Sequence, residues 1–241
     1  MFNNFFKKSS FGLYIGDNSL RFIELLSAKN SLKLGRYGEY EIQDKKELEK
    51  ILASLKKNFG LKTVNFSVAN EYMENVQDYF SALNNSKIAI KSFEIEEQSL
   101  ARVFLKKGER RAHMIVNFGK NQSTIFIISA GVLVYHFVAS NAVYFLRDEI
   151  SKHFLNWHLH KEKGENKPAI EKIIICGNGS NLQEFSEYIS VNMRNKTEVA
   201  NAWINILDTE KNVPEINFEQ SFAFAPALGL ALKDFIVDPS L

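Results

Sequence analysis

The sequence predicts an α/β fold in which two halves of the chain repeat one order of strands and helices. Two similar segments indicate the repeat, since each has an apolar strand, a glycine, a polar turn and a second apolar strand: Phe11–Leu25 and Met114–Ile128. Alternating strand and helix patterns follow each of these hairpins. A hairpin meander followed by β-α-β crossovers predicts a mixed five-stranded sheet with helices on its faces, once in each half.

In the first half we expect the order β-β-β-α-β-α-β-α. The strands are expected at Gly12–Ile15, Leu20–Leu26, Leu32–Ile42, Val64–Ala69 and Lys87–Phe93. Asp44 is expected to cap a helix that ends at Gly60, because apolar residues recur between them at helical spacing. Asn70 is expected to cap the second helix, and Glu96–Lys106 to form the third.

The second half repeats this order. Its strands are expected at Ala112–Asn117, Thr124–Ser129, Val132–Ala139, Ile170–Cys176 and Lys196–Ala200. Its helices are expected from Asn141 to about His160, at Leu182–Met193 and at Ser221–Phe235. The polar run Lys107–Arg111 is turn-prone and suggests a boundary. We therefore expect a flexible N-terminal tail at 1–10, a first subdomain at 11–110 and a second at 111–241.

The composition excludes several classes of protein. The chain has 241 residues with a net charge of +2, which is too small to indicate a nucleic-acid partner. A single cysteine, Cys176, cannot form a disulfide within one chain. No apolar run has the length of a membrane span. The N-terminus combines phenylalanines with Lys7 and Lys8, which suits either a frayed tail or a weak membrane contact.

Three glycine turns and the closing segment carry a family resemblance. The turns lie in Gly12–Ser19, Asn117–Thr124 and Gly177–Ser180, and the closing segment is Phe224–Lys233. In these strings, and in their order and spacing, the chain resembles the type IV pilus assembly protein PilM family, which is related to the cell-division protein FtsA. The resemblance implies the actin-like fold, in which two ribonuclease-H-like subdomains of β-β-β-α-β-α-β order flank a central cleft.

The resemblance also implies a nucleotide site with ATP as a weakly held cofactor. Its cofactor-binding residues would be Gly16, Asp17, Asn18 and Ser19, then Gly119, Lys120, Asn121, Gln122 and Ser123, and finally Gly177, Asn178, Gly179 and Ser180. Arg21 would add positive charge beside Lys120. Tyr14 and Asn117 stand where the family places its metal-site carboxylates. Because Mg²⁺ needs hard oxygen ligands, we expect no catalytic residues and no metal site.

Two interpretations of the paired turns remain open. In the first they are turns only, with Gly16 and Gly119 present for positive φ and Asp17 and Asn18 making a hairpin. In the second they still hold a nucleotide, which acts as a conformational ligand. A ribonuclease-type nuclease is disfavoured, because its metals need carboxylates on the first and fourth strands and Tyr14 occupies the first position. His153 and His160 share one helix face, yet two histidines do not complete a zinc site.

The family usually carries one inserted subdomain in each half, and this chain has no room for either: Val64–Phe93 is a plain β-α-β unit, and 161–169 is short.

The resemblance implies a non-enzymatic cytoplasmic scaffold or adaptor of a type IV pilus or related secretion assembly, peripheral to the inner membrane through its partners. The implied partners are the cytoplasmic N-terminal tail of a PilN-like inner-membrane protein, other pilus assembly proteins and a second copy of the chain. In the family, that tail binds beside the first insertion. The alternatives are an active actin-like ATPase or an FtsA-like filament protein.

Overall fold

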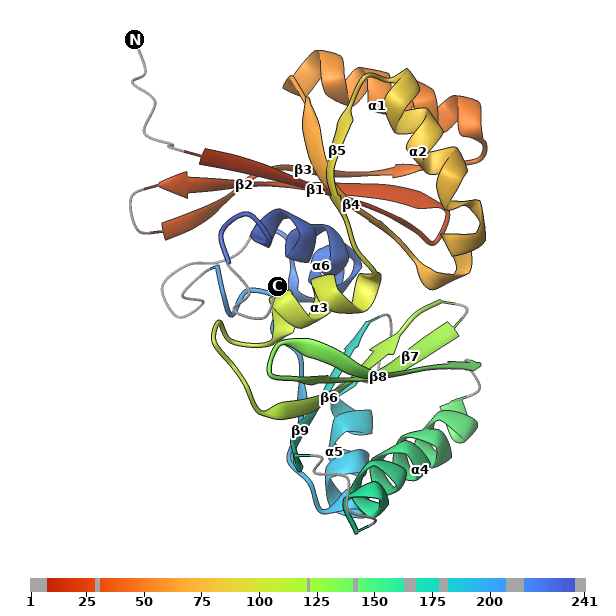
Figure 1. Cartoon of the computed structure of the whole chain (residues 1–241), viewed down its shortest axis with the longest axis vertical. Coiled ribbons are helices and arrows are strands. Elements are labelled where there is room, and N and C mark those ends of the chain that lie inside the picture. The colour runs from red at the N-terminus through yellow and green to blue at the C-terminus, as the bar shows by residue number, and fades with distance from the viewer. Residues whose placement is uncertain are drawn as a thin grey trace. The chain divides into compact units, whose positions relative to one another are not determined.

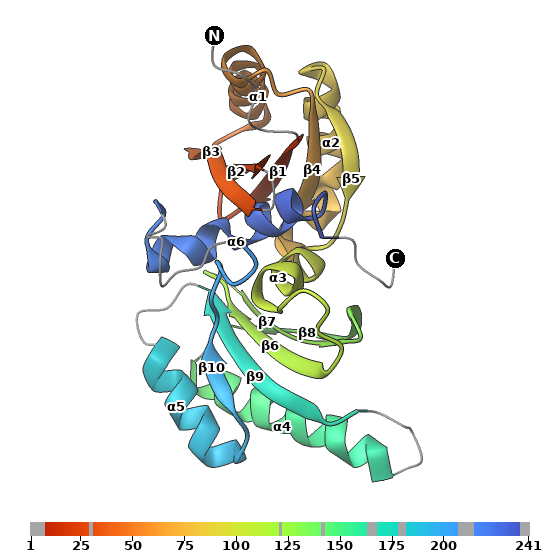
Figure 2. The ribbon, with the colours of Figure 1, turned by 90° about the vertical axis from the view of Figure 1, so that its left-hand side faces the viewer.

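A computed structural model describes residues 8–28, 31–120, 122–140, 143–162, 168–177, 182–206 and 215–236. These residues form two compact units (Figures 1 and 2). Among the described residues, unit 1 contains the chain up to Val103 together with the segment from Trp203 to Ile236, and unit 2 contains those of Phe104–Ala202. The expected second subdomain at 111–241 differs from this division, because the last helix belongs to unit 1.

Unit 1 is built on a five-stranded sheet in the order β3-β2-β1-β4-β5. Its strands are β1 (Lys8–Gly16), β2 (Ser19–Ala28), β3 (Ser31–Glu41), β4 (Thr63–Val68) and β5 (Ala89–Phe93). The first three strands pair antiparallel, while β4 runs parallel to both β1 and β5. Its helices are α1 (Lys45–Phe59), the 3₁₀ helix η1 (Asn70–Asn75), α2 (Val76–Asn85), α3 (Glu96–Phe104) and α6 (Phe218–Leu232).

Unit 2 repeats this topology. Its strands are β6 (Ala112–Phe118), β7 (Gln122–Ser129), β8 (Val132–Ser140), β9 (Ile170–Gly177) and β10 (Thr197–Val199), and its helices are α4 (Val143–Glu162) and α5 (Leu182–Met193). The sheet order is β10-β9-β6-β7-β8, so each strand has the neighbours of its counterpart in unit 1. Pairing directions also agree, since the meander is antiparallel and β6, β9 and β10 are parallel. The predicted duplication of the β-β-β-α-β-α-β order is confirmed.

The ends of α1 follow the sequence signals. Asp44 Oδ1 accepts a hydrogen bond from the backbone N–H of Glu47 at 2.8 Å, and Gly60 ends the helix with φ of 66°. Asn70 was expected to cap the second helix in the same way, and that prediction is wrong. Its side-chain amide instead donates to Glu97 Oε1 at 2.7 Å, and η1 occupies the turn before α2 begins.

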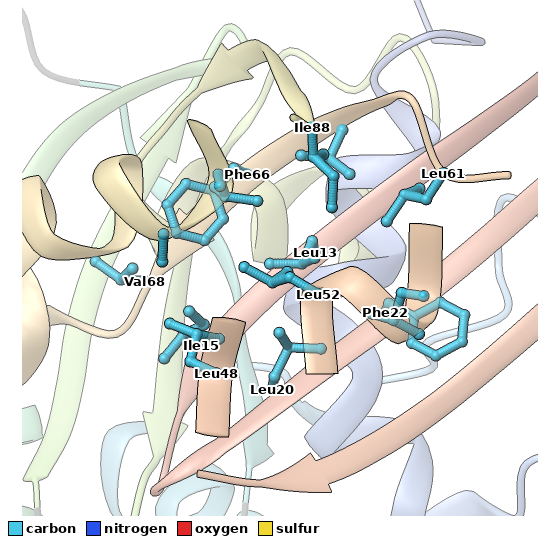
Figure 3. Close-up of a cluster of buried hydrophobic side chains, with 14 residues drawn as sticks. Leu13, Ile15, Leu20, Phe22, Leu48, Leu52, Leu61, Phe66, Val68 and Ile88 are labelled. Atoms are coloured by element: carbon cyan, nitrogen blue, oxygen red, sulfur yellow. The ribbon is translucent and has the colours of Figure 1, made fainter. Parts of the chain in front are cut away.

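Helices α1 and α2 cover one face of the first sheet and enclose the main apolar core of unit 1 (Figure 3). The fully buried side chains come from alternate strand positions and from helix positions at three- or four-residue spacing: Leu13, Ile15, Leu20, Phe22, Leu48, Leu52, Leu55, Phe66 and Val68. Burying each such side chain contributes roughly 1.5–3 kcal/mol. The core therefore fixes which β1 residues point toward the helices and which point away from them.

Helix α6 packs on the opposite face of the same sheet, against β1, β2 and β4 (Figure 2). It is buried along most of its length, which the apolar run after Ser221 permits. Chain order had placed this helix in the second subdomain, but its packing depends on a close approach to Gly12 of β1. In the described part of the chain, no helix has both the length and the apolar character that a membrane span requires.

The first strand begins earlier than expected. A flexible tail was expected at 1–10, whereas Lys8, Ser9 and Ser10 pair with β2 as part of β1. The rest of the expected tail, residues 1–7, lies outside the described residues. The extra pairing adds the charged Lys8 and the hydroxyls of Ser9 and Ser10 to the sheet at the amino end of β1.

Candidate functional site

The hairpin turn between β1 and β2 is the first of the predicted site segments. Asp17 and Asn18 occupy its two central positions with φ of 53° and 56°, the backbone of a type I′ turn. Positive φ was expected at Gly16 and Gly119, and it occurs at neither. Gly16 is needed for another reason, because a Cβ there would lie 2.6 Å from the hydroxyl oxygen of Tyr14.

Tyr14 fills the space beside this turn. Its side chain is almost fully buried and lies over Gly16, on the side of β1 opposite to the apolar core. Burial raises the pKa of the phenol well above its ordinary value, and the charge of Glu96 and a hydrogen bond to it raise it further. At the position where the family places a metal-site carboxylate, this chain therefore has a neutral phenol that is hydrogen-bonded to the carboxylate of Glu96.

Arg21, which had been expected to supply positive charge to a nucleotide, is already paired. Its guanidinium donates from Nε to Glu39 Oε1 at 2.9 Å, and its Nη2 lies 2.7 Å from the same oxygen. Nη1 lies 3.8 Å from Asp17 Oδ2. The carboxylates of Asp17 and Glu39 thus lie beside one guanidinium, and their excess negative charge repels a phosphate.

Two hydrogen-bond donors of the turn are also engaged. The backbone N–H of Asn18 donates to the Tyr72 hydroxyl at 3.0 Å, and that hydroxyl donates to Asn18 Oδ1 at 2.8 Å. Ser19 donates its hydroxyl to the carbonyl of Gly16 at 2.9 Å. A phosphate-binding turn needs backbone N–H groups that point at the ligand. In this turn the N–H of Asn18 and the hydroxyl of Ser19 stabilise the turn itself.

The second predicted turn, in unit 2, joins β6 to β7. Gly119 donates its N–H to the carbonyl of Gln122 at 3.0 Å, and a Cβ at Gly119 would lie 2.4 Å from that same oxygen. Close backbone approach, and not positive φ, explains the glycine. Lys120 is exposed and Ser123 is buried, while Asn121 lies outside the described residues.

The third predicted segment begins at Gly177, the last residue of β9. Gly177 has φ of 101°, and a Cβ there would lie 2.2 Å from the carbonyl oxygen of Phe118 and 2.7 Å from Asn117 Oδ1. The structure therefore brings Asn117 and Gly177 together on the adjacent strands β6 and β9. The other residues of this segment, Asn178, Gly179 and Ser180, lie outside the described part of the chain.

The sequence did not predict one cation–π stack in unit 2. The guanidinium of Arg147 on α4 lies 4.0 Å from the ring centroid of Tyr188 and 5.8 Å from that of Phe185, both on α5. Phe185 in turn meets Phe118 of β6 edge to face, with the ring centroids 5.0 Å apart. Arg147 is separated from these rings by a strand and two connections, so no local spacing in the sequence reveals the stack.

The histidines of α4 are engaged in local contacts. His153 Nε2 lies 2.9 Å from Glu149 Oε2, and its Nδ1 forms a hydrogen bond with the Tyr135 hydroxyl. His158 Nδ1 bonds the carbonyl of Phe154 one turn earlier. Among the described residues, no three histidine, cysteine or acidic side chains are grouped so that they would hold a metal ion.

The same hairpin turn also borders a cavity on the helix-covered face of unit 1. The cavity has a volume of about 250 Å³ and is lined by Ile15, Asn18, Ile42, Gln43, Asp44, Lys45, Leu48, Tyr72, Asn75, Asp78 and Tyr79. Its aliphatic residues come from β1, from the connection after β3 and from α1, and its two tyrosines come from η1 and α2. Lys45 pairs with Asp78 at 2.8 Å. Together with Asp44, the lining has two carboxylates and one ammonium group, so this rim carries excess negative charge.

Comparison with solved structures identifies the fold of the chain, although comparison of sequences finds no relative. No protein-family profile matches the chain, and no curated protein sequence matches it. Solved structures do match, the first being a PilM–PilN type IV pilus biogenesis complex at 13% identity, with a TM-score of 0.61 and coverage of 93% of this chain and 98% of the other. The chain has the actin-like fold.

Two further actin-like structures support this assignment. The ethanolamine utilization protein EutJ from Carboxydothermus hydrogenoformans matches with a TM-score of 0.57 and 14% identity, covering 93% of this chain and 89% of the other. MreB5 of Spiroplasma citri bound to ADP matches with 0.53 and 12%, covering 82% and 93%. These identities are low, so the comparisons show the fold and nothing finer.

A nucleotide is the ligand that the actin-like fold implies, as the bound ADP of MreB5 illustrates. The described residues of the first turn do not fit its phosphates. Tyr14 fills the space over Gly16, the donors of Asn18 and Ser19 are engaged within unit 1, and carboxylates outnumber the guanidinium of Arg21.

Proposed function

We propose that this chain is a PilM-like scaffold or adaptor of a type IV pilus or related secretion assembly, cytoplasmic and held at the inner membrane through its partners. The observation that carries the proposal is the occupied turn of unit 1, where Tyr14 lies over Gly16 and Arg21 is paired with acids. A filled phosphate turn favours a role in binding other proteins over a role in turning over ATP. The match to a PilM–PilN complex over nearly the whole chain supports the pilus assignment.

The nucleotide site of this scaffold is proposed to be degenerate. The segments 16–19, 119–123 and 177–180 are the positions where the resemblance places ATP, and they are proposed as the residues that a weakly held nucleotide would approach. Any such nucleotide acts as a conformational ligand, since neither Tyr14 nor Asn117 offers the hard anionic oxygen that Mg²⁺ prefers.

The first prediction concerns ATP. We expect no magnesium-dependent ATP hydrolysis by the purified chain, because the metal-site carboxylates are absent and the first turn repels phosphate. The measurement is steady-state phosphate release with and without magnesium, together with calorimetry of ATP binding. Steady turnover that the Gly119→Asp substitution abolishes would show that the turns still perform ATP chemistry, and the scaffold proposal would then be wrong.

The proposed partner is the cytoplasmic N-terminal tail of a PilN-like inner-membrane protein, and the cavity of about 250 Å³ is proposed as its docking site. Every residue that lines the cavity comes from unit 1 itself, so docking there requires no inserted subdomain. The apolar floor of Ile15 and Leu48 suits an aliphatic side chain. The carboxylates of Asp44 and Asp78 at the rim suit the amino terminus or a basic side chain of such a tail.

The second prediction tests this docking site with a synthetic peptide. The peptide carries the N-terminal tail of the PilN-like protein from the same organism. Truncating Tyr79 to alanine is expected to weaken binding about tenfold or more, because an aromatic side chain that lines a cavity is the kind of contact that dominates peptide affinity. Calorimetry measures the affinity, and Tyr188→Ala, an exposed tyrosine of unit 2, is the matched control. Equal affinities for the wild type and Tyr79→Ala would remove the cavity from the proposal.

A further inference from the structure

A second cavity lies at the other end of β1 from the hairpin turn. It has a volume of about 240 Å³ and is lined by Lys8, Ser9, Ser10, Phe11, Gly60, Lys62, Thr63, Val64, Asn65, Lys91 and Asp234. These residues come from the amino ends of β1 and β4, from the connection between α1 and β4, from β5 and from the segment after α6. All of them belong to unit 1, and none is part of the predicted nucleotide site or of the docking cavity.

The lining of this cavity is strongly basic. Three ammonium groups, from Lys8, Lys62 and Lys91, face a single carboxylate, that of Asp234. Lys91 pairs with the Asp234 carboxylate, while Lys8 donates to the Asp234 backbone carbonyl at 2.5 Å and lies over the ring of Phe235. Lys62 is exposed and has no ion pair with any residue that the structure describes. Two positive charges of the lining are therefore not balanced by the carboxylate.

A chain of buried polar groups supports the floor of the cavity. Ser92 donates its hydroxyl to Asn65 Oδ1 at 2.8 Å, and Asn65 Nδ2 donates to Ser10 Oγ at 3.3 Å. Ser10 and Asn65 are 3% and 2% exposed, so both are held in fixed positions within the sheet. Burial opposes ionisation of Asp234, but hydrogen bonds from Lys91 and Ser10 outweigh it and lower the pKa of Asp234. The carboxylate is therefore ionised at neutral pH, and the excess of positive charge is the net state of the site.

We propose that this lysine cavity binds a phosphoryl group. A phosphate carries up to two negative charges on tetrahedral oxygens, which matches the two uncompensated ammonium charges and the adjacent hydroxyls of Ser9 and Thr63. Lysine ammonium groups bind phosphate as point charges and need no planar geometry. The phosphoryl group belongs either to a small soluble phosphate or to a phospholipid headgroup.

The first arm of the test uses inorganic phosphate. The full chain is titrated at constant ionic strength, with sodium chloride as the compensating salt, and backbone amide shifts are followed by NMR. Saturable shifts are expected at residues 8–11, 60–65, 91 and 234. Lys62→Gln is expected to weaken binding at least about fivefold, since it removes one charge-assisted contact. Asp234→Asn is expected to tighten binding, because it removes the carboxylate that opposes the anion.

Lys62→Gln is the decisive variant, because Lys62 is exposed and its loss leaves no buried group without a partner. The matched control is Lys50→Gln, an exposed lysine of α1 outside the cavity, which should bind phosphate as the wild type does. If Asp234→Asn fails to fold, the comparison of Lys62→Gln with Lys50→Gln still decides the outcome.

The second arm distinguishes the source of the phosphoryl group. Flotation is measured with vesicles of phosphatidylglycerol and phosphatidylcholine, and with phosphatidylcholine alone. Flotation only with the anionic vesicles, lost in Lys62→Gln and kept in Lys50→Gln, assigns the site to a lipid headgroup. Saturable phosphate binding without flotation assigns it to a soluble phosphate. The proposal is overturned if Lys62→Gln equals the wild type in both arms, or if neither probe binds. Neither arm involves the peptide cavity, so the scaffold proposal stands or fails separately.

Discussion

Replacing Glu94 with alanine is expected to destabilise unit 1 by about 3–5 kcal/mol, the cost of breaking a buried ion pair from one side. Glu94 Oε1 lies 2.6 Å from Arg102 Nη1, Glu94 Oε2 lies 3.1 Å from Nη2, and both side chains are almost fully buried. Lys233 Nζ lies 2.8 Å from the same carboxylate, and Arg102 also donates to the carbonyl of Gly229 at 2.9 Å. Removal of the carboxylate leaves two cations close together, one of them buried, and loosens the hold on the end of α6.

Urea unfolding of unit 1 can be followed separately from that of unit 2. The chain has two tryptophans, of which Trp203 is buried in unit 1 and Trp157 lies in unit 2. A Trp157→Phe background therefore makes fluorescence a report on unit 1. The double variant Glu94→Ala with Arg102→Leu is expected to recover part of the loss, because no buried charge then lacks its partner. Lys45→Ala, which breaks the exposed pair with Asp78, should cost less than about 1 kcal/mol. A loss for Glu94→Ala as small as that of Lys45→Ala would contradict the prediction.

The order of the elements was predictable because its signals are local. Helical spacing of apolar residues, the cap at Asp44 and the glycine at position 60 act within one or two turns, and each of them is confirmed. The alternation of buried residues such as Leu13 and Ile15 defines β1 in the same way. Two copies of one local order then imply two copies of one sheet topology, and both sheets have it.

The placement of α6 could not be predicted in this way. The apolar run after Ser221 indicates burial but does not show which sheet the helix packs against. The decision depends on Gly12 and Gly229, which permit backbone contacts with segments more than a hundred residues away in the chain. The prediction that Asn70 caps the second helix was wrong for a similar reason. Its preferred local role as a cap competes with a tertiary hydrogen bond to Glu97, and the tertiary bond determines the structure.

In the candidate site, too, local features were predictable and tertiary contacts were not. The sequence identified the turns and the substitutions at Tyr14 and Asn117, since these are single positions in a known pattern. It did not show that Tyr14 lies over Gly16, that Arg21 is held by Glu39, or that Tyr72 closes the turn through Asn18. These contacts join residues on different elements. They convert a site that lacks its carboxylates into one whose space and donors are already occupied, which is the stronger reason to expect no ATP turnover.

The substitution Gly12→Ala is expected to destabilise unit 1 by about 3 kcal/mol or more, at the upper end of the cost of overpacking. The added Cβ would lie 1.9 Å from the carbonyl oxygen of Ala227 and 2.6 Å from the backbone nitrogen of Ala231. Both are backbone atoms of α6, so no change of side-chain rotamer relieves the clash and the helix itself must shift. The expected result is a lower urea midpoint for the Trp203 transition.

Gly60→Ala is the matched control for this experiment, since it adds the same methyl group within unit 1. A Cβ at Gly60 meets nothing within 4 Å, and its cost is only that of a left-handed backbone at φ of 66°, roughly 1–2 kcal/mol. Trimming side chains of α6 should not rescue Gly12→Ala, because the contacts are with the backbone. If Gly12→Ala were less destabilising than Gly60→Ala, the close approach of β1 and α6 would not exist in solution, and the assignment of the last helix to unit 1 would have to be withdrawn.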